Sequence, residues 1–136
     1  MATLLSRSAI LAAPVSTKDI EIPEWGGSVR VRALSVSRRV ELLDAIALNE
    51  REHSAWTIDQ SKPEEEREGL TRVDLYDQSV LIALFAIVDD DNEPMFSADD
   101  YAAFGELDYA TIAQIWHAQH DLGKPRSVED VKKNSG

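Results

Sequence analysis

Residues 21–34, EIPEWGGSVRVRAL, carry the pattern that decides the fold at the N-terminal end of this 136-residue chain. Gly26 and Gly27 stand between two runs in which apolar and polar side chains alternate. Such alternation is typical of strands with one buried face, and two consecutive glycines readily adopt the positive φ angles of a two-residue hairpin turn. The sequence therefore predicts an antiparallel β-hairpin over residues 18–34.

A two-residue loop at the glycines also predicts how the two strands pair. One face of the hairpin is then apolar and the other carries opposite charges. Because Pro23 cannot donate a ladder hydrogen bond, the first strand is expected at a sheet edge. The expected pairs are Glu24 with Val29, Ile22 with Val31, and Ile20 with Ala33 on the apolar face, and Glu21 with Arg32 on the other.

The outer face of this hairpin is the candidate interaction surface. Trp25 adjoins the loop, opposite Ser28 in the expected pairing, and shares a face with Arg30 and Arg32, where the hairpin itself offers little to bury an indole. Exposed aromatic and arginine side chains are common anchors at protein interfaces. We therefore predict protein-interface roles for Trp25, Arg30 and Arg32, with Trp56, near the end of the first predicted helix, as a further candidate.

Helical periodicity takes over after the hairpin. Ser37 is a candidate N-cap, and Val40, Leu43, Ile46 and Ala47 recur on one apolar stripe. The polar, glutamate-rich stretch 57–70 predicts a solvated, mobile loop or, equally, the start of a short acidic helical turn. The next helix is apolar on most sides and is therefore expected at the centre of the core. The helices are expected at about residues 37–55, 71–88, 97–104 and 108–122.

These elements predict an α+β fold, in which an N-terminal β-hairpin packs on a mostly helical domain of about four helices. Residues 1–17 are expected to form a flexible N-terminal segment, residues 18–126 a single domain, and residues 127–136 a C-terminal tail. An isolated hairpin is only marginally stable in water, so this one must lie on the helices or pair with another chain.

Charge and composition exclude several classes of partner. The formal net charge is −11, whereas a protein that binds nucleic acid needs clustered Lys and Arg. The charge is uneven, because residues 1–39 carry six Lys or Arg against three acids, while residues 40–136 carry eight against twenty-two. The most apolar run, residues 80–88, is too short for a transmembrane helix. We expect neither nucleic acid nor a membrane as partner.

No catalytic constellation stands out from the sequence. There is no cysteine, no nucleophile elbow and no glycine-rich phosphate loop. His117, His120 and Asp121 are close enough on one helix to share a metal, but surface histidines are the more ordinary interpretation. The acidic run 89–93 lacks the ligand spacing of a calcium loop and is typical of a capped turn between helices. We expect no catalytic residues, no metal site and no cofactor.

The order of these features resembles the tail assembly chaperones of long-tailed, siphovirus-type bacteriophages and prophages. The similar stretches are IEIPEWGGSVRVRALSVSRRVEL, DDDNEPMFSADDYAAFGE and VEDVKKNS, together covering roughly residues 8–135. Their most specific parts are PEWGG followed by VRVR, the arginine-containing start of the first helix, MFSADD and KNS. The acidic stretch 57–70 is the part least similar to the family.

The resemblance implies a non-catalytic assembly factor in the cytoplasm of the infected bacterium, absent from the mature virion. Its implied partner is the phage tape measure protein, a long and largely helical protein whose apolar stripes must stay covered until the tail tube assembles. The family also implies self-association, as a ring or another homo-oligomer, and in many members a longer version made by translational frameshifting.

Two other interpretations of the residues stay open at this stage. A minor virion structural protein, of the tail or of head completion, would remain in purified particles. A protein-binding module unrelated to phage would have a specific partner other than the tape measure protein. An enzyme would need a site built from residues with no recognisable spacing.

Overall fold

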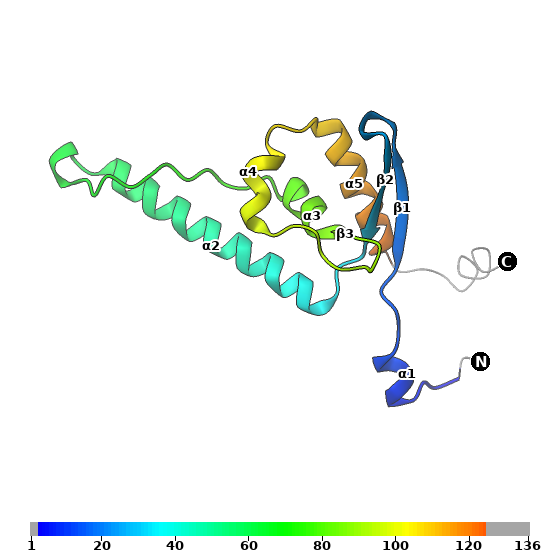
Figure 1. Ribbon diagram of the computed structural model, residues 1–136. Coiled ribbons are helices and arrows are strands. Elements are labelled where there is room, and N and C mark those ends of the chain that lie inside the picture. The colour runs from blue at the N-terminus through cyan, green and yellow to red at the C-terminus, as the bar shows by residue number, and fades with distance from the viewer. Residues whose placement is uncertain (1–2, 125–136) are drawn as a thin grey trace.

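The computed structural model describes residues 3–124 and shows a small sheet packed against helices, with one long helix projecting from the body (Figure 1). The α+β fold predicted from the sequence is confirmed, with the hairpin at its N-terminal side. The elements are α1 (Arg7–Leu11), β1 (Thr17–Ile22), η1 (Pro23–Trp25), β2 (Gly27–Arg32), α2 (Val36–Ser61), η2 (Glu64–Glu66), α3 (Gln78–Ala86), β3 (Ile87–Val88), η3 (Ala98–Asp100), α4 (Tyr101–Phe104) and α5 (Tyr109–Leu122).

The sheet has three antiparallel strands in the order β1-β2-β3, so β1 lies at an edge, as Pro23 predicted. The expected register was wrong, because each residue of β1 pairs with a residue of β2 four positions before the expected one. Pro23 begins a 3-10 turn, and only Gly26 adopts a positive φ (73°), so residues 23–26 form a four-residue connection in place of the predicted two-residue loop. The observed pairs include Ile22 with Gly27, Ile20 with Val29, Glu21 with Ser28, and Thr17 with Arg32.

The apolar face of the hairpin survives this shift. Side chains alternate with a period of two, so a displacement by four residues, an even number, leaves each side chain on its original face. Ile22 and Val31 are fully buried, and Ile20 and Val29 pack against the core.

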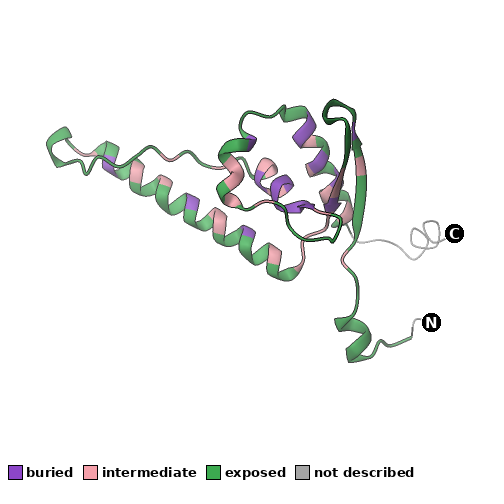
Figure 2. Ribbon diagram, viewed as in Figure 1, coloured by how far each residue is buried: buried purple, intermediate pink, exposed green. Residues whose placement is uncertain are grey.

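The core lies between this face of the sheet, α3 and α5 (Figure 2). α3 has its N-cap at Asp77, and five of its nine residues are buried, which confirms that it is the central helix. α5 begins at its predicted cap, where the Asp108 carboxylate accepts a hydrogen bond from the Thr111 backbone N–H. The largest fully buried apolar side chains are Ile22, Val31, Leu81, Leu84, Ile112 and Ile115.

Two helix predictions need correction. The first helix begins after Ser35, whose hydroxyl caps it in place of Ser37, and it continues to Ser61 rather than ending near residue 55. The helix predicted over 71–88 begins only at Gln78, and its last two residues, Ile87 and Val88, instead form β3 and pair with β2. Periodicity alone does not distinguish a buried strand from the end of a buried helix.

Residues 67–77, which we call the return segment, run in extended form back along α2 (Figure 1). Side chains of α2 hold the segment. The Asn49 amide donates to the Asp74 carbonyl and accepts from the Tyr76 N–H, both at 2.9 Å, and His53 Nδ1–H donates to the Val73 carbonyl at 2.6 Å. The region predicted as a solvated loop over 57–70 is therefore largely ordered, as the end of α2, η2 and the start of this segment.

The N-terminal segment contains a short helix, α1, that lies away from the body below the hairpin (Figure 1). Every residue from 3 to 14 is exposed. The C-terminal tail predicted from residue 127 lies outside the described residues. Within residues 3–124 no helix is both long and apolar enough to cross a bilayer.

Candidate functional site

The main hollow beside the hairpin is an open groove of about 690 Å³, which we call the Trp25 groove. It lies between β2, the chain that follows β3, and the α4–α5 connection. Its lining is mostly apolar, and Trp25, Met95 and Leu107 are each 40–55% exposed. Its apolar lining residues are Trp25, Val29, Ile87, Val88, Met95, Phe96, Ala103, Phe104 and Leu107.

The groove exists because β3 is shorter than β2. β3 pairs only with Arg30 and Val31, and in the described part of the chain residues 27–29, the end of β2 next to the turn, have no strand on that side. After Val88 the chain turns away at Asp89 instead of continuing along β2. This leaves apolar side chains open to solvent where a longer strand would have covered them.

Arg30 ties the hairpin to one rim of the groove. Its guanidinium donates to both carboxylate oxygens of Asp19, at 2.7 and 3.2 Å, and to the Asp90 carbonyl and Asn92 Oδ1, at 3.2 and 3.3 Å. Arg32 reaches the Asn92 carbonyl at 3.5 Å. The hydrogen bond from Arg30 lowers the pKa of Asp19 below its ordinary value. Both arginines therefore position the turn that borders the groove.

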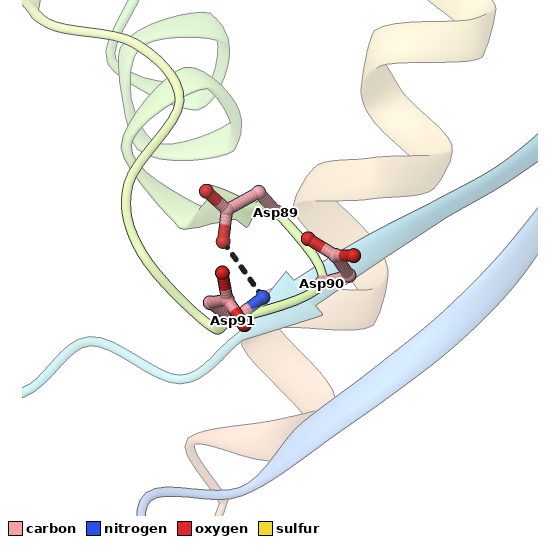
Figure 3. A group of neighbouring side chains, drawn as sticks. All are labelled: Asp89, Asp90 and Asp91. Carbon is pink, nitrogen blue, oxygen red and sulfur yellow. Dashed lines mark hydrogen bonds between the residues drawn. The ribbon is translucent and has the colours of Figure 1, made fainter.

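That turn contains the acidic run 89–93, whose three aspartates are shown in Figure 3. Asp89 Oδ1 accepts hydrogen bonds from the backbone N–H groups of Asp91 and Glu93, at 2.9 and 3.0 Å. Asn92 adopts a left-handed conformation with φ 64°. One carboxylate oxygen from each of Asp89, Asp90 and Asp91 lies within 4.8 Å of the other two. Asp89 thus acts as the cap of a turn, as expected, although the turn follows a strand and not a helix.

A second exposed apolar surface runs along α2. Val36, Val40 and Leu43 are 85%, 52% and 47% exposed, and Ala47 continues the same side of the helix. We call these four residues the α2 stripe. The sequence pattern grouped Val40, Leu43, Ile46 and Ala47 on one stripe, but only Ile46 of these packs against the core, and the other three are exposed. The inner face consists of Leu42, Ala45, Ile46, Asn49, His53, Trp56 and Asp59.

The predicted interface residues fall into two groups. Trp25, Arg30 and Arg32 all lie on the hairpin, where Trp25 and Arg30 line the groove. Trp56 lies twenty residues beyond the start of α2, about 30 Å along the helix. It packs against His53, with ring centroids 5.9 Å apart, and lies under the guanidinium of Arg72 at 5.6 Å. The structure therefore does not bring Trp56 together with the hairpin residues.

Sequence reasoning missed the α2 stripe as a surface, although its spacing was visible. The spacing 36, 40, 43, 47 was recognised in part, but an apolar stripe alone does not tell whether its own domain covers it. The candidate metal ligands His117 and His120 both pack on Trp116, with ring centroids 4.9 and 5.1 Å away. Among residues 3–124, the groups close enough to share a metal ion are the three aspartates and do not include these histidines.

Asp59 holds the far end of α2 to the return segment. Its side chain is only 2% exposed, and its two oxygens accept from the backbone N–H groups of Glu68 and Leu70, at 2.7 and 3.1 Å. The pKa of Asp59 is lowered from its ordinary value of 3.8, chiefly by the hydrogen bond from Glu68. The turn between α2 and the return segment therefore depends on an ionised carboxylate.

Acid is expected to release this turn. A carboxylate with a lowered pKa stabilises the folded state above its unfolded pKa and loses that contribution as the pH falls through the folded pKa. The amide proton shifts of Glu68 and Leu70, followed by NMR, should stay constant from neutral pH down to about pH 5 and change below the ordinary value of 3.8.

The matched control is Asp59→Asn, which keeps the shape and removes the titration. An amide presents an NH₂ group where one carboxylate oxygen was, so it retains at most one of the two hydrogen bonds. In this variant the two amide shifts should already differ at neutral pH and respond little to acid. Shifts that do not respond to pH in the unsubstituted protein would contradict the role assigned to Asp59.

Comparison with known proteins identifies the family. The family model for phage tail assembly chaperones matches residues 7–134. The structure of the tail assembly chaperone of bacteriophage HK97 is similar with a TM-score of 0.51 at 16% identity, covering 86% of this chain and 96% of that one. No curated protein matches the sequence. The match covers the hairpin, all the main helices and the groove. The chain therefore belongs to the phage tail assembly chaperone family.

Proposed function

We propose that this chaperone binds the phage tape measure protein, keeps it soluble and promotes assembly of the tail tube around it. The role is non-catalytic, is exercised in the cytoplasm of the host bacterium, and ends before the virion is complete. Family membership supports a task in tail assembly. The observation that carries the choice of partner is the α2 stripe, an apolar surface on a projecting helix.

The stripe has the spacing that a helical partner requires. Val36, Val40, Leu43 and Ala47 follow one another at intervals of four, three and four residues. This is the seam along which two helices pack with interlocking side chains. α2 has 26 residues and a length of about 39 Å, so it can contact several turns of a partner helix.

The α2 stripe is suited to cover an apolar surface of the tape measure protein temporarily. A largely helical tape measure protein exposes apolar stripes before the tube forms, and these would otherwise associate with one another. The chaperone covers such a stripe with its own and contributes its net charge of −11, which keeps the complex dispersed. Since the stripe is held on a helix clamped by the return segment, it is presented without prior folding.

The hairpin residues have a different part in this proposal. Trp25 contacts another chain through the groove, while Arg30 and Arg32 hold the rim of that groove through their hydrogen bonds to residues 90 and 92. Trp56, half-buried beside His53, stays a predicted interface residue at the far end of α2.

Co-expression with the tape measure protein of the same phage tests the proposal. The soluble fraction of the tape measure protein should rise when the chaperone is present, and light scattering should detect a complex. The double variant Val40→Gln, Leu43→Gln should weaken this complex at least about tenfold, because each apolar side chain is worth roughly 1 kcal/mol or more on burial. An equally soluble tape measure protein in the absence of the chaperone would contradict the proposal.

A matched control removes apolar surface elsewhere. Leu70 and Leu75 are 39% and 54% exposed in the return segment. The double variant Leu70→Gln, Leu75→Gln should leave the complex unchanged. Equal weakening by both double variants would argue against the stripe as the binding surface. Mass spectrometry of purified virions should find the tape measure protein without the chaperone, whereas a stoichiometric amount would indicate a virion component.

A further inference from the structure

We propose that the Trp25 groove binds an extended segment of another protein, which adds a short strand to the open edge of β2. The segment carries apolar side chains at alternate positions, with a Lys or Arg between them. The proposal rests on the proposed function only where that function gives Trp25 a contact with another chain. It adds the conformation and the chemistry of the bound segment, and it does not require the segment to belong to the tape measure protein.

The open edge of β2 directs backbone groups away from β1. In an antiparallel pair, residues whose backbone bonds the partner strand alternate with residues whose backbone points to the other side. The Ala33 N–H donates to the Ser16 carbonyl at 2.9 Å, so in the observed register every second residue back to Gly27 also bonds β1. Ser28 and Arg30 therefore point their N–H and C=O groups toward the side of β3.

Ser28 has no backbone partner on that side. Arg30 pairs with Val88, so the position that would pair with Ser28 is residue 90, but the chain has already turned away there. Among the hydrogen bonds within residues 3–124, none uses the N–H or C=O group of Ser28 on this side. Ser28 is exposed and lines the groove. A strand edge with free backbone groups is a template for pairing with another strand.

The unpaired groups of Ser28 favour an extended partner over a helical one. The backbone groups of a helix bond within the helix, so its interior offers no N–H or C=O to Ser28. A residue of an extended segment offers both, because the two residues of a hydrogen-bonded antiparallel pair exchange both bonds. In such strand addition, main-chain hydrogen bonds give affinity and pockets for alternate side chains give specificity.

The apolar wall of the groove selects the side chains on either side of the residue that pairs with Ser28. Side chains of paired residues lie on the same face of a sheet. The segment residues opposite Gly27 and Val29 therefore lie on the face of Val29, which packs against the core. Phe104 of the core and the half-exposed Leu107 line the groove. Apolar side chains two positions apart fit this wall.

The residue between these two apolar positions meets acidic groups. It pairs with Ser28 and so lies on the outer face of the sheet, where Glu21 occupies the position paired with Ser28 in β1. Asp89 and Asp90 border the groove as well. Arg30, which also lines the groove, is already paired with a carboxylate at 2.7 Å. The remaining charge near this position is negative, so a Lys or Arg is complementary.

An NMR titration with a synthetic peptide tests the proposal. The probe is acetyl-Ser-Val-Lys-Val-Ser-amide, added at millimolar concentration to the isotope-labelled full chain. The amide proton of Ser28 should show the largest shift and exchange more slowly with water, because it gains an acceptor. The amide signals of Val29 and Leu107 should shift with it. Unchanged signals at these three residues would overturn the proposal.

Two matched peptides separate strand addition from apolar contact alone. Methylation of the backbone nitrogen of the lysine removes the group that donates to the Ser28 carbonyl, and should weaken binding at least about fivefold. Replacement of the lysine by glutamate should also weaken binding, and this difference should shrink as salt is added. Equal binding of the original and the methylated peptide would overturn the added strand.

Two variants of the protein make the same distinction from the other side. Ser28→Pro removes an N–H that bonds nothing within residues 3–124, at a strand edge that tolerates proline. It should weaken the peptide at least about fivefold and leave the circular dichroism unchanged. If this variant folds poorly, the methylated peptide still decides. The control Leu75→Ser, in the return segment, should bind the peptide as the unsubstituted protein does.

The spectra without peptide distinguish other occupants of the groove. Slow exchange of the Ser28 amide at every protein concentration would mean that a segment of the same chain covers it. Protection that grows with protein concentration would mean that a second copy covers it, and either result would overturn the proposal. The titration contains no tape measure protein, so its failure and a failure of the α2 stripe test are separate results.

Discussion

Leu84→Ala is expected to lower the free energy of unfolding by about 3 kcal/mol, within a span of roughly 2–5 kcal/mol. Leu84 is fully buried in α3, the helix at the centre of the core. Removing its terminal carbons costs both the transfer of apolar surface and the cavity left behind, because α5 and the sheet are held by their own contacts and close in only partly. Urea unfolding followed by circular dichroism measures the change.

The matched control is Leu48→Ala on α2, where the leucine is 48% exposed. The same atoms are removed, but water already covers half of the side chain, so the loss should stay below about 1 kcal/mol. Similar losses in the two variants would contradict the placement of α3 at the centre. An unchanged slope of unfolding free energy against urea would show that the folded and unfolded ensembles remain comparable.

Arg38→Met is expected to cost about 2–4 kcal/mol of unfolding free energy. The side chain of Arg38 is 13% exposed and donates to the carbonyl oxygens of Phe85 and Phe96, at 3.1 and 2.6 Å. It also pairs with Glu41 at 2.7 Å and lies 4.1 Å from the centre of the Phe85 ring. Methionine fills part of the volume but leaves two partly buried carbonyl groups without their donors.

Two further variants isolate the cause. Arg39 is exposed on the neighbouring position, so Arg39→Met should change stability by no more than about 0.5 kcal/mol. Arg38→Lys keeps the charge but lacks the planar fork, so it should recover only a minor part of the loss. If lysine restored full stability, charge rather than the paired hydrogen bonds would explain the role of Arg38.

Arg38 matters for function because of what it connects. Its hydrogen bonds join the start of α2 to the end of α3 and to the chain at Phe96, which lines the Trp25 groove. One side chain therefore connects the helix that carries the α2 stripe to the wall of the Trp25 groove. Its place in the arginine-containing start of the first helix, part of the family resemblance, agrees with a structural task.

The hairpin shows which local patterns were sufficient. Alternation of apolar and polar residues identified both strands and their buried face, and a period of two is unaffected by the shift that the turn introduced. The turn itself was mispredicted, because Pro23 and Gly26 together allow a 3-10 connection that is no less acceptable locally than a Gly26-Gly27 loop. Which of them forms depends on how Ile22 and Val31 fit into the core.

The bounds of some helices were predicted correctly and those of others were not, because only some bounds depend on residues close in sequence. The caps at Ser97 and Asp108 are local hydrogen bonds, so their residues predicted the starts of α4 and α5 to within a few positions. The length of α2 depends on Asn49, His53 and Asp59, whose partners lie 9 to 27 residues away in the sequence. No local pattern shows that these contacts form. The helix start predicted at Thr71 was wrong for the same reason, because residues 73–76 are held in extended form by Asn49 and His53 of α2.

For each candidate surface, the sequence predicted one part and only the tertiary structure decided the other. Trp25 was predicted as an exposed residue of the hairpin, and its exposed fraction of 41% agrees, but the groove beside it arises only because β3 ends after two residues. The α2 stripe was recognisable as an apolar pattern, yet only packing decided that Leu42 and Ile46 face the core and that Val40 and Leu43 face solvent.

The sequence by itself determined the fold class, the buried face of the hairpin, the helix caps at Ser97 and Asp108, and the resemblance to the family. All of these depend on residues close together in the chain, through backbone geometry, side-chain alternation and capping hydrogen bonds. The tertiary structure alone decided the register, the extent of α2 and α3, and which apolar side chains remain exposed. These depend on competition among distant segments for one core, and a pattern of apolar residues is compatible with more than one outcome of that competition.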